Sequence, residues 1–150
     1  MLTVIMNFQH TNDLQSLQYL ASEKENYLMS TILVRTLMDR RYFHGIRTAA
    51  AEGLAKCATK DLQYIGLFHL QKAFQEFFCF PNSAMTRSND FSDRTAYYIQ
   101  CTIPKAMAKV RDSDGKVPTS VKRFLFDQLK FNDNSNNEVR GVNASGCYNC

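Results

Sequence analysis

A run of small residues between Ile46 and Ala58 constrains the fold of this chain more than any other feature of its sequence. Its members recur three and four residues apart, the period of one face of an α-helix: Ile46, Ala49, Ala50, Gly53, Leu54, Cys57 and Ala58. Because most of these side chains are small, a neighbouring helix can approach this face closely. The run predicts a tightly packed helix and favours a scaffold over a catalyst.

The residues around this helix are typical of a HEAT-type repeat, in which pairs of helices stack and present surfaces to partners. Asp39 precedes the helix, Arg47 lies in its first turn, and alanines follow. Strand-like alternation is nearly absent, so we predict an all-α chain, a fragment of a HEAT/armadillo-like helical repeat (α-solenoid). Only one clear pair is visible, whereas about three repeats are usually needed. The chain is therefore either a piece of a longer solenoid or an irregular helical domain.

Apolar spacing and capping residues set the expected helix boundaries in the first half of the chain. A short helix is predicted near 14–20, and a second helix over 27–38 follows a capping box of Ser22 and Glu25. The small-residue helix comes next, after a turn at 42–45. A long helix over about 59–79 is opened by Thr59 and Asp61. The long helix has apolar residues over a wide arc, as an inner member of a stack needs.

Turn-forming residues from 80 to 91 predict a loop before the last helices. Ser92 is expected to cap a helix that begins at Asp93 and kinks or restarts at Pro104, because proline lacks a backbone donor. Helical structure is then expected from 105 to 111, and a final helix from 118 to 131. The predicted buried face of this last helix consists of Val121, Phe124, Leu125 and Leu129.

Charge and cysteine content favour an intracellular soluble protein. The net charge of +4 comes from mixed acidic and basic residues, which is weak support for a nucleic-acid partner. The five cysteines are odd in number, and three of them lie in apolar helical patterns, which suits a reducing compartment. We find no secretory signal and no apolar stretch near the ~20 residues that span a bilayer, so no membrane partner is expected.

Three words of the sequence stand in a particular order. They are RYFHGIR at 41–47 with LAK at 54–56, YYIQCTIPKAMA at 97–108, and DQLKFNDN at 127–134. Together they resemble the family of subunit two of the transcription initiation factor TFIID, a TBP-associated factor. The likeness runs from about Asp13 to Glu138, and the second and third words are its more specific parts.

The resemblance implies a large nuclear protein with an aminopeptidase-like amino-terminal part and a helical-repeat part, of which this chain is the start. The family's role is a non-catalytic scaffold that supports TFIID assembly, with TBP and the other TBP-associated factors as partners and core-promoter DNA contacted through the assembled complex. Two other interpretations stay open. One is the helical carboxyl-terminal part of a zinc aminopeptidase, and the other is a HEAT-type adaptor unrelated to transcription.

Asp39 and Arg47 are the predicted structural pair. In a HEAT-like stack, an acidic residue near the turn between helices can accept hydrogen bonds from an arginine and so fix the stacking register. The alternative is two exposed charges of little energetic consequence, worth under ~1 kcal/mol.

Arg35, Arg40 and Arg41, together with Arg47, form a possible basic surface around the same turn, with aromatic residues between them. Arginine with aromatic side chains can bind nucleic acid. The nearby acidic residues and the modest net charge favour a solvated or protein-facing surface instead.

No residue pattern predicts catalysis, a cofactor, a metal site or a small-molecule substrate. Cys147 and Cys150 form a single CxxC, whereas a zinc site usually needs four ligands. The histidines His10, His44 and His69 lie outside any HExxH motif. We expect His69 on the surface and His44 in a turn.

The helical-repeat domain is assigned to residues 1–131, and residues 132–150 are expected to have little order because Asn, Ser and Gly dominate them. Residues 139–150 depart from the family pattern, and we interpret them as an artefact of the gene model or of cloning. Loss of the following repeat would leave an apolar face open and promote self-association.

Overall fold

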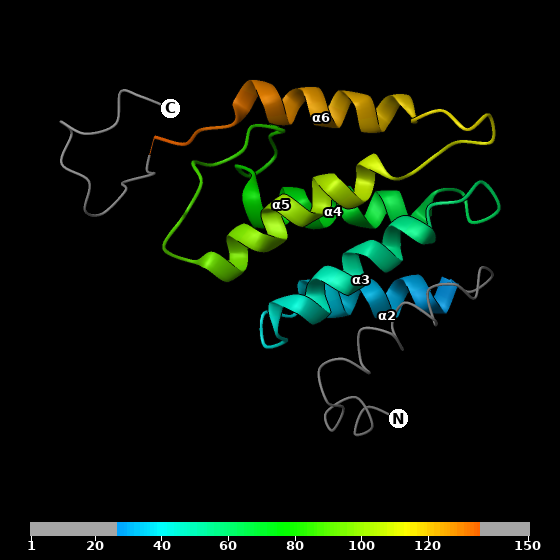
Figure 1. Ribbon diagram of the computed structural model, residues 1–150, viewed down its shortest axis with the longest axis horizontal. Coiled ribbons are helices and arrows are strands. Elements are labelled where there is room, and N and C mark those ends of the chain that lie inside the picture. The colour runs from blue at the N-terminus through cyan, green and yellow to red at the C-terminus, as the bar shows by residue number, and fades with distance from the viewer. Residues whose placement is uncertain (1–26, 136–150) are drawn as a thin grey trace, which may run out of the picture.

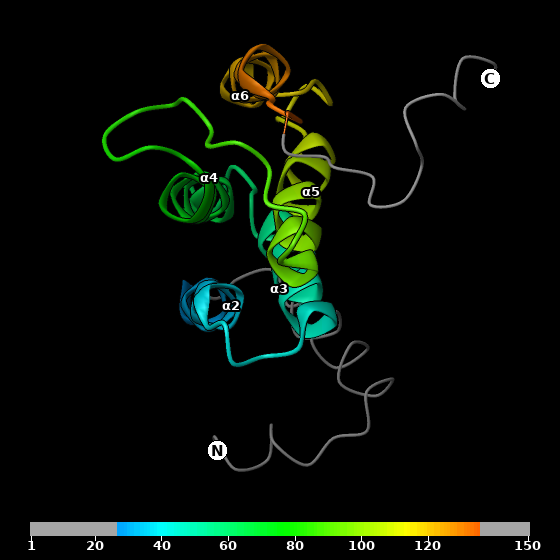
Figure 2. The same cartoon turned by 90° about the vertical axis from the view of Figure 1, so that its left-hand side faces the viewer.

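The computed structural model describes residues 27–135, which form five α-helices arranged in two layers with no β-strand (Figures 1 and 2). The helices are α2 (Tyr27–Met38), α3 (His44–Lys56), α4 (Ile65–Phe78), α5 (Arg94–Ala108) and α6 (Thr119–Phe131). In Figure 2, α2 and α4 lie in one layer and α3 and α5 in the other, while α6 closes the far end. The predicted all-α helical-repeat architecture is confirmed.

Helix α3 is the central member of the stack, because it packs against α2, α4 and α5. Every member of its predicted small-residue face is buried except Ile46, which is half-buried. Ala51 and Arg47, which lie outside that face, are buried as well. A helix with neighbours on three sides has almost no free arc, and small side chains are what let three helices approach it.

The core runs through the stack without interruption from α2 to α6. Its large fully buried side chains come from all five described helices: Leu33, Leu37, Leu54, Leu70, Phe74, Ile99, Ile103, Met107 and Val121. Phe74 of α4 makes an edge-to-face contact with Phe124 of α6, with ring centroids 5.0 Å apart. This contact joins the last helix to the inner pairs.

The fourth helix begins later than the sequence predicts. Residues 59–64 form turns, and α4 starts only at Ile65, not near Thr59. Gln63 and Tyr64 have φ angles of 50° and 55°, which no right-handed helix contains. Leu62 lies in the core within this turn, so the chain uses these residues to reverse direction between α3 and α4.

The predictions for α5 need three corrections. The cap is Asp93, whose Oδ1 accepts a hydrogen bond from the Ala96 amide at 2.9 Å, whereas the Ser92 hydroxyl donates to Asp90. The helix also continues through Pro104 to Ala108 without a restart. Buried residues on both sides of the proline anchor this helix against its neighbours, and that packing outweighs one lost backbone hydrogen bond. The predicted helical structure beyond Ala108 is replaced by a turn.

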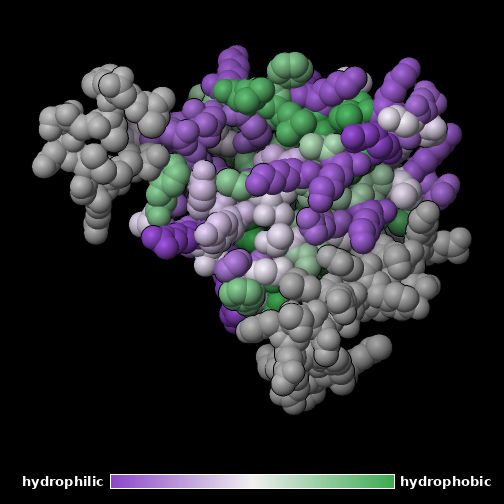
Figure 3. Space-filling view, in the orientation of Figure 1, coloured by the Kyte–Doolittle hydropathy of each residue, from purple (hydrophilic) through white to green (hydrophobic). Residues whose placement is uncertain are grey.

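Helix α6 buries less than the sequence predicts. Val121 is buried and Phe124 and Leu125 are half-buried, but Leu129 is 79% exposed and the neighbouring Phe126 is 70% exposed. Helix α6 is the last described helix, and no other helix within residues 27–135 covers its outer side (Figure 1). In the space-filling view, hydrophobic side chains reach the surface at this end of the molecule among polar ones (Figure 3).

Residues 132–135 differ from the expected loose tail, because several hydrogen bonds attach them to the loop that precedes α5. The Asn89 side chain donates to the side-chain oxygens of Asn132 (3.0 Å) and Asn134 (2.5 Å), and its backbone amide donates to the carbonyl of Asp133 (3.0 Å). The predicted helix at 14–20, the capping box and residues 136–150 lie outside the described residues, so those predictions stay predictions.

Candidate functional site

The candidate site lies at the turn between α2 and α3, where the sequence placed both the structural pair and the basic surface. Helix α2 ends at Met38, and the Asp39 amide still donates to the Arg35 carbonyl at 3.0 Å. The turn over 39–43 then carries Arg40 and Arg41, and α3 begins at His44. Arg47 therefore lies within the first turn of α3, next to the end of α2.

Arg47 is a buried arginine, with only 4% of its surface exposed. Its Nε–H donates to the Leu37 carbonyl at 2.8 Å. The last carbonyls of a helix have no partner inside that helix, so this bond satisfies one of them and ties the end of α2 to α3. Burial lowers the pKa of Arg47, and the nearby Arg40 charge lowers it further.

Asp39 is paired with Arg41 and not with Arg47. The carboxylate accepts from Nη2 of Arg41 at 2.6 Å and from its Nε at 2.9 Å. These hydrogen bonds lower the pKa of Asp39 from its ordinary 3.8 to about 2. Among residues 27–135, Asp39 and Arg47 form no direct hydrogen bond, because Arg41 occupies the carboxylate and Nε of Arg47 donates to the Leu37 carbonyl. A role of the two residues in the stacking register stays a prediction.

The four arginines do not form one basic surface. Arg35 is exposed on α2, and Arg41 is neutralised by Asp39. Arg40 and Arg47 instead both approach the ring of Phe77 at the end of α4, with their Cζ atoms 5.4 Å and 5.6 Å from its centroid. A guanidinium over an aromatic face is an attractive arrangement. The possible basic surface thus divides: Arg47 is buried, and the exposed Arg40 lies with it against Phe77.

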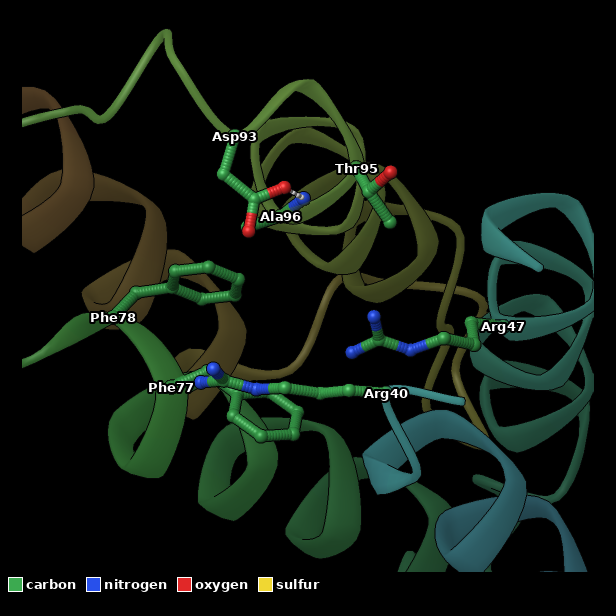
Figure 4. A pocket seen from close by; sticks show the side chains of 7 residues that line it. All are labelled: Arg40, Arg47, Phe77, Phe78, Asp93, Thr95 and Ala96. Carbon is green, nitrogen blue, oxygen red and sulfur yellow. Dashed lines mark hydrogen bonds between the residues drawn. The ribbon is translucent and has the colours of Figure 1, made fainter. Parts of the chain in front are cut away.

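A cavity of about 220 Å³ opens beside these two guanidinium groups (Figure 4). Figure 4 shows Arg47 extending from α3 into the space between α4 and the start of α5. The lining residues come from the turn after α2 and from α3, α4 and the first turn of α5: Arg40, Arg47, Phe77, Phe78, Asp93, Thr95 and Ala96. Asp93 is the only acidic residue among them, and its carboxylate is engaged in capping α5.

Sequence reasoning identified only the arginines of this cavity. For Phe77 and Phe78 the sequence predicts only a place in the wide apolar arc of the long helix, and it predicts nothing for Thr95 and Ala96. Thirty residues separate Arg47 from Phe77, and a further sixteen separate Phe77 from Asp93, so no local spacing brings them together. Only the stacking of α4 and α5 on α3 does so.

The two histidines of the described part have structural surroundings. His44 begins α3, and its ring centroid is 4.1 Å from that of Phe43 and 5.2 Å from that of Tyr98. His69 is half-buried on α4, where burial lowers its pKa. Between residues 27 and 135, no three His, Cys, Asp or Glu side chains gather in a metal-binding arrangement. Cys147 and Cys150 lie outside that range.

None of the helices from Tyr27 to Phe131 is long and apolar enough to cross a bilayer.

The loop before α5 provides the other notable set of contacts. It connects residues of the FNDN word at 131–134 to positions more than forty residues earlier. Thr86 donates its hydroxyl to the Phe131 carbonyl at 2.8 Å, and Gln100 of α5 donates to Asn89 at 2.6 Å. These residues hold the end of α6 beside the start of α5.

Comparison with known proteins places this geometry in a family context. Residues 8–143 match the family described as "TAF2-like, TPR repeats". The chain is 44% identical over 127 residues to the transcription initiation factor TFIID subunit 2 of Schizosaccharomyces pombe, covering 83% of this chain and 11% of that protein. It is 43% identical over 114 residues to the Saccharomyces cerevisiae subunit, covering 76% and 8%.

The Drosophila melanogaster subunit is 37% identical over 107 residues, which is 70% of this chain and 9% of that protein. The chain thus spans about a tenth of the length of these relatives. No solved structure matches it significantly. TPR repeats, like HEAT repeats, stack helix pairs into a solenoid, which agrees with the two-layer arrangement of α2 to α5.

Proposed function

This chain belongs to the TAF2-like family with TPR repeats, and on that premise we propose that it is a non-catalytic helical-repeat scaffold of TFIID. Its place of action is the nucleus, where it supports assembly with TBP and the other TBP-associated factors. Contact with core-promoter DNA is made through the assembled complex. The similarity to relatives named TFIID subunit 2 supports the assignment to the TFIID complex, and the stack of helices supports the role of a scaffold.

The observation that carries the scaffold role is the exposed outer face of α6. Phe126 and Leu129 are 70% and 79% exposed at the end of an otherwise continuous core. A stack of helices buries such residues against a further helix, either from a following repeat or from another protein. An exposed apolar pair at the end of a stack is a surface for association, not for chemistry.

Co-purification of the tagged gene product from its own cells tests this proposal. We expect TBP and other TBP-associated factors to be recovered with it. The matched variant replaces Phe126 and Leu129 with serine, which should reduce that recovery, while replacing the exposed Phe68 of α4 with serine should not. Recovery of the protein alone contradicts the scaffold role. Equal recovery with all three forms contradicts the assignment of the α6 face as the surface that binds the partners.

A further inference from the structure

The cavity beside Arg47 has an excess of positive charge. Two guanidinium groups, those of Arg40 and Arg47, line it, against one carboxylate, that of Asp93. That carboxylate already accepts the Ala96 amide, and neither arginine forms an ion pair with any described residue. Asp39, the other nearby acid, is held by Arg41. The lining of the cavity therefore carries a net positive charge of one.

The Arg47 guanidinium is positioned to bind a hydrogen-bond acceptor in this cavity. The residue is only 4% exposed, yet the single hydrogen bond that its side chain makes to a described residue comes from Nε, to the Leu37 carbonyl. That bond fixes the guanidinium plane, and Figure 4 shows its outer end directed into the cavity. The two Nη nitrogens therefore face the space between α4 and α5 with no hydrogen-bond partner between residues 27 and 135. An arginine with one nitrogen fixed and two free presents a fork that matches a carboxylate.

Two further features of the cavity favour an anion with an apolar stem. The first turn of α5 forms one wall through Thr95 and Ala96, and the positive end of a helix dipole favours negative charge. Phe77 and Phe78 form the opposite wall (Figure 4). Aromatic walls suit the methylene groups of an acidic side chain better than they suit water.

The same features disfavour a nucleic-acid backbone. Phosphate contacts to a duplex are made by exposed, extended basic side chains, whereas Arg47 lies below the surface with only 4% exposure. A volume of about 220 Å³ admits one side chain.

We propose that the cavity lined by Arg40, Arg47 and Phe77 binds a glutamate or aspartate side chain from an acidic segment of a partner protein. The carboxylate lies between the two guanidinium groups, and the stem of the side chain lies along the phenylalanine walls. This site is separate from the exposed face of α6, so it can be tested on the 150-residue chain without TFIID. Failure here would leave the scaffold proposal untouched.

The test follows the side-chain Nε–Hε signals of Arg40 and Arg47 by NMR in the isotope-labelled 150-residue chain. The probe is a short peptide with glutamates alternating with leucines, and its control has glutamine at each glutamate position. We expect the glutamate peptide to shift both signals saturably, and the glutamine peptide to leave them unchanged. Sodium acetate and a short DNA duplex are added in separate arms.

Variants locate the binding. Arg40→Gln should weaken the binding of the glutamate peptide about tenfold, because one charge-assisted contact is lost. Arg35→Gln, which removes the same charge from the exposed face of α2, should not weaken it. Thr95→Glu should block the cavity with its own carboxylate, while Thr95→Gln should not. Since Arg40, Arg35 and Thr95 are at least partly exposed, these variants keep the fold.

Three results would overturn the proposal. The first is equal binding of the glutamate and glutamine peptides, and the second is equal weakening by Arg40→Gln and Arg35→Gln. The third is that acetate or the duplex shifts the two arginine signals at concentrations no higher than those at which the glutamate peptide shifts them. In that case the site belongs to free carboxylates or to DNA.

Discussion

The position of Gly66 in α4 lies so close to the carbonyl oxygen of Leu54 in α3 that a β-carbon there would stand 1.9 Å from it. The same β-carbon would also come within 3.0 Å of the Ala58 amide nitrogen. Because both obstacles are backbone atoms, neither can rotate away. The α3–α4 contact therefore depends on a glycine in a helix, a position where glycine otherwise costs stability.

Gly66→Ala should lower the free energy of unfolding by about 2 kcal/mol or more, because α4 has to move away from α3. Thermal unfolding followed by circular dichroism measures this loss. Gly45→Ala is the matched control. Its β-carbon would meet only the ring of Phe43, at 2.9 Å, and that ring is half exposed and can turn away. Equal loss in the two variants would contradict the close approach of the helices.

Arg47→Ala should destabilise the fold by about 1–3 kcal/mol, because the Leu37 carbonyl loses its buried donor and a void opens beside Phe77. Urea unfolding gives the difference. Arg35→Ala removes an exposed arginine of α2 and should change stability by less than about 0.5 kcal/mol. If both variants unfold at the same urea concentration as the parent chain, Arg47 does not hold α2 and α3 together.

The Asp39–Arg41 pair should make stability depend on pH only in acid. The pKa of Asp39 is lowered to about 2 in the folded chain, from an ordinary 3.8. Its contribution is therefore fully present above about pH 4–5 and is lost as the pH falls toward 2. The difference in melting temperature between the parent chain and Asp39→Asn measures this contribution. It should be constant from pH 8 to pH 5 and shrink below pH 4. A difference that changes between pH 8 and pH 5 would point to another group.

Asn89→Ala should loosen the attachment of residues 131–134 to the loop before α5. The buried Asn89 amide contacts Asn132, Asn134 and Gln100 through its side chain. Its removal should cost about 1–3 kcal/mol, because the partners lose hydrogen bonds in a partly buried site. Hydrogen exchange should accelerate at the Asn89 and α6 amides and stay unchanged in α2. Asn82→Gly, in the exposed part of the same loop, is the control, because glycine tolerates the φ of 56° at that position.

Serine substitution on α6 should separate folding from association. Leu129→Ser and Phe126→Ser should leave the melting temperature nearly unchanged, because both side chains are largely exposed, and should reduce self-association measured by analytical ultracentrifugation. Phe124→Ser should lower the melting temperature, because it removes the edge contact with Phe74. Unchanged association in the first two variants would mean that another surface is responsible.

Local spacing was enough to predict the helices whose patterns are complete within one segment. Helix α2 occupies the predicted residues 27–38, and the small-residue face of α3 is buried as its period requires. The order of the three sequence words also identified the family, because that order needs no three-dimensional information. Periodicity and word order are properties of neighbouring residues, so the chain alone determines them.

Tertiary packing decided where local signals conflicted or were silent. Thr59 and Asp61 are acceptable helix-starting residues, yet the reversal between α3 and α4 delays the helix to Ile65. Pro104 is a helix breaker, yet buried neighbours carry α5 through it. In both cases contacts with other helices outweigh a preference of about 1–3 kcal/mol.

The candidate site shows the same division. The sequence by itself determined that arginines cluster near the turn after α2, and it determined the helical nature of every segment that surrounds them. Only the tertiary structure decided that Asp39 pairs with Arg41 and that Arg40 and Arg47 meet Phe77 beside the start of α5. The physical reason is that pairing depends on distance in space, and the stacking of α3, α4 and α5 sets those distances across residues far apart in the chain.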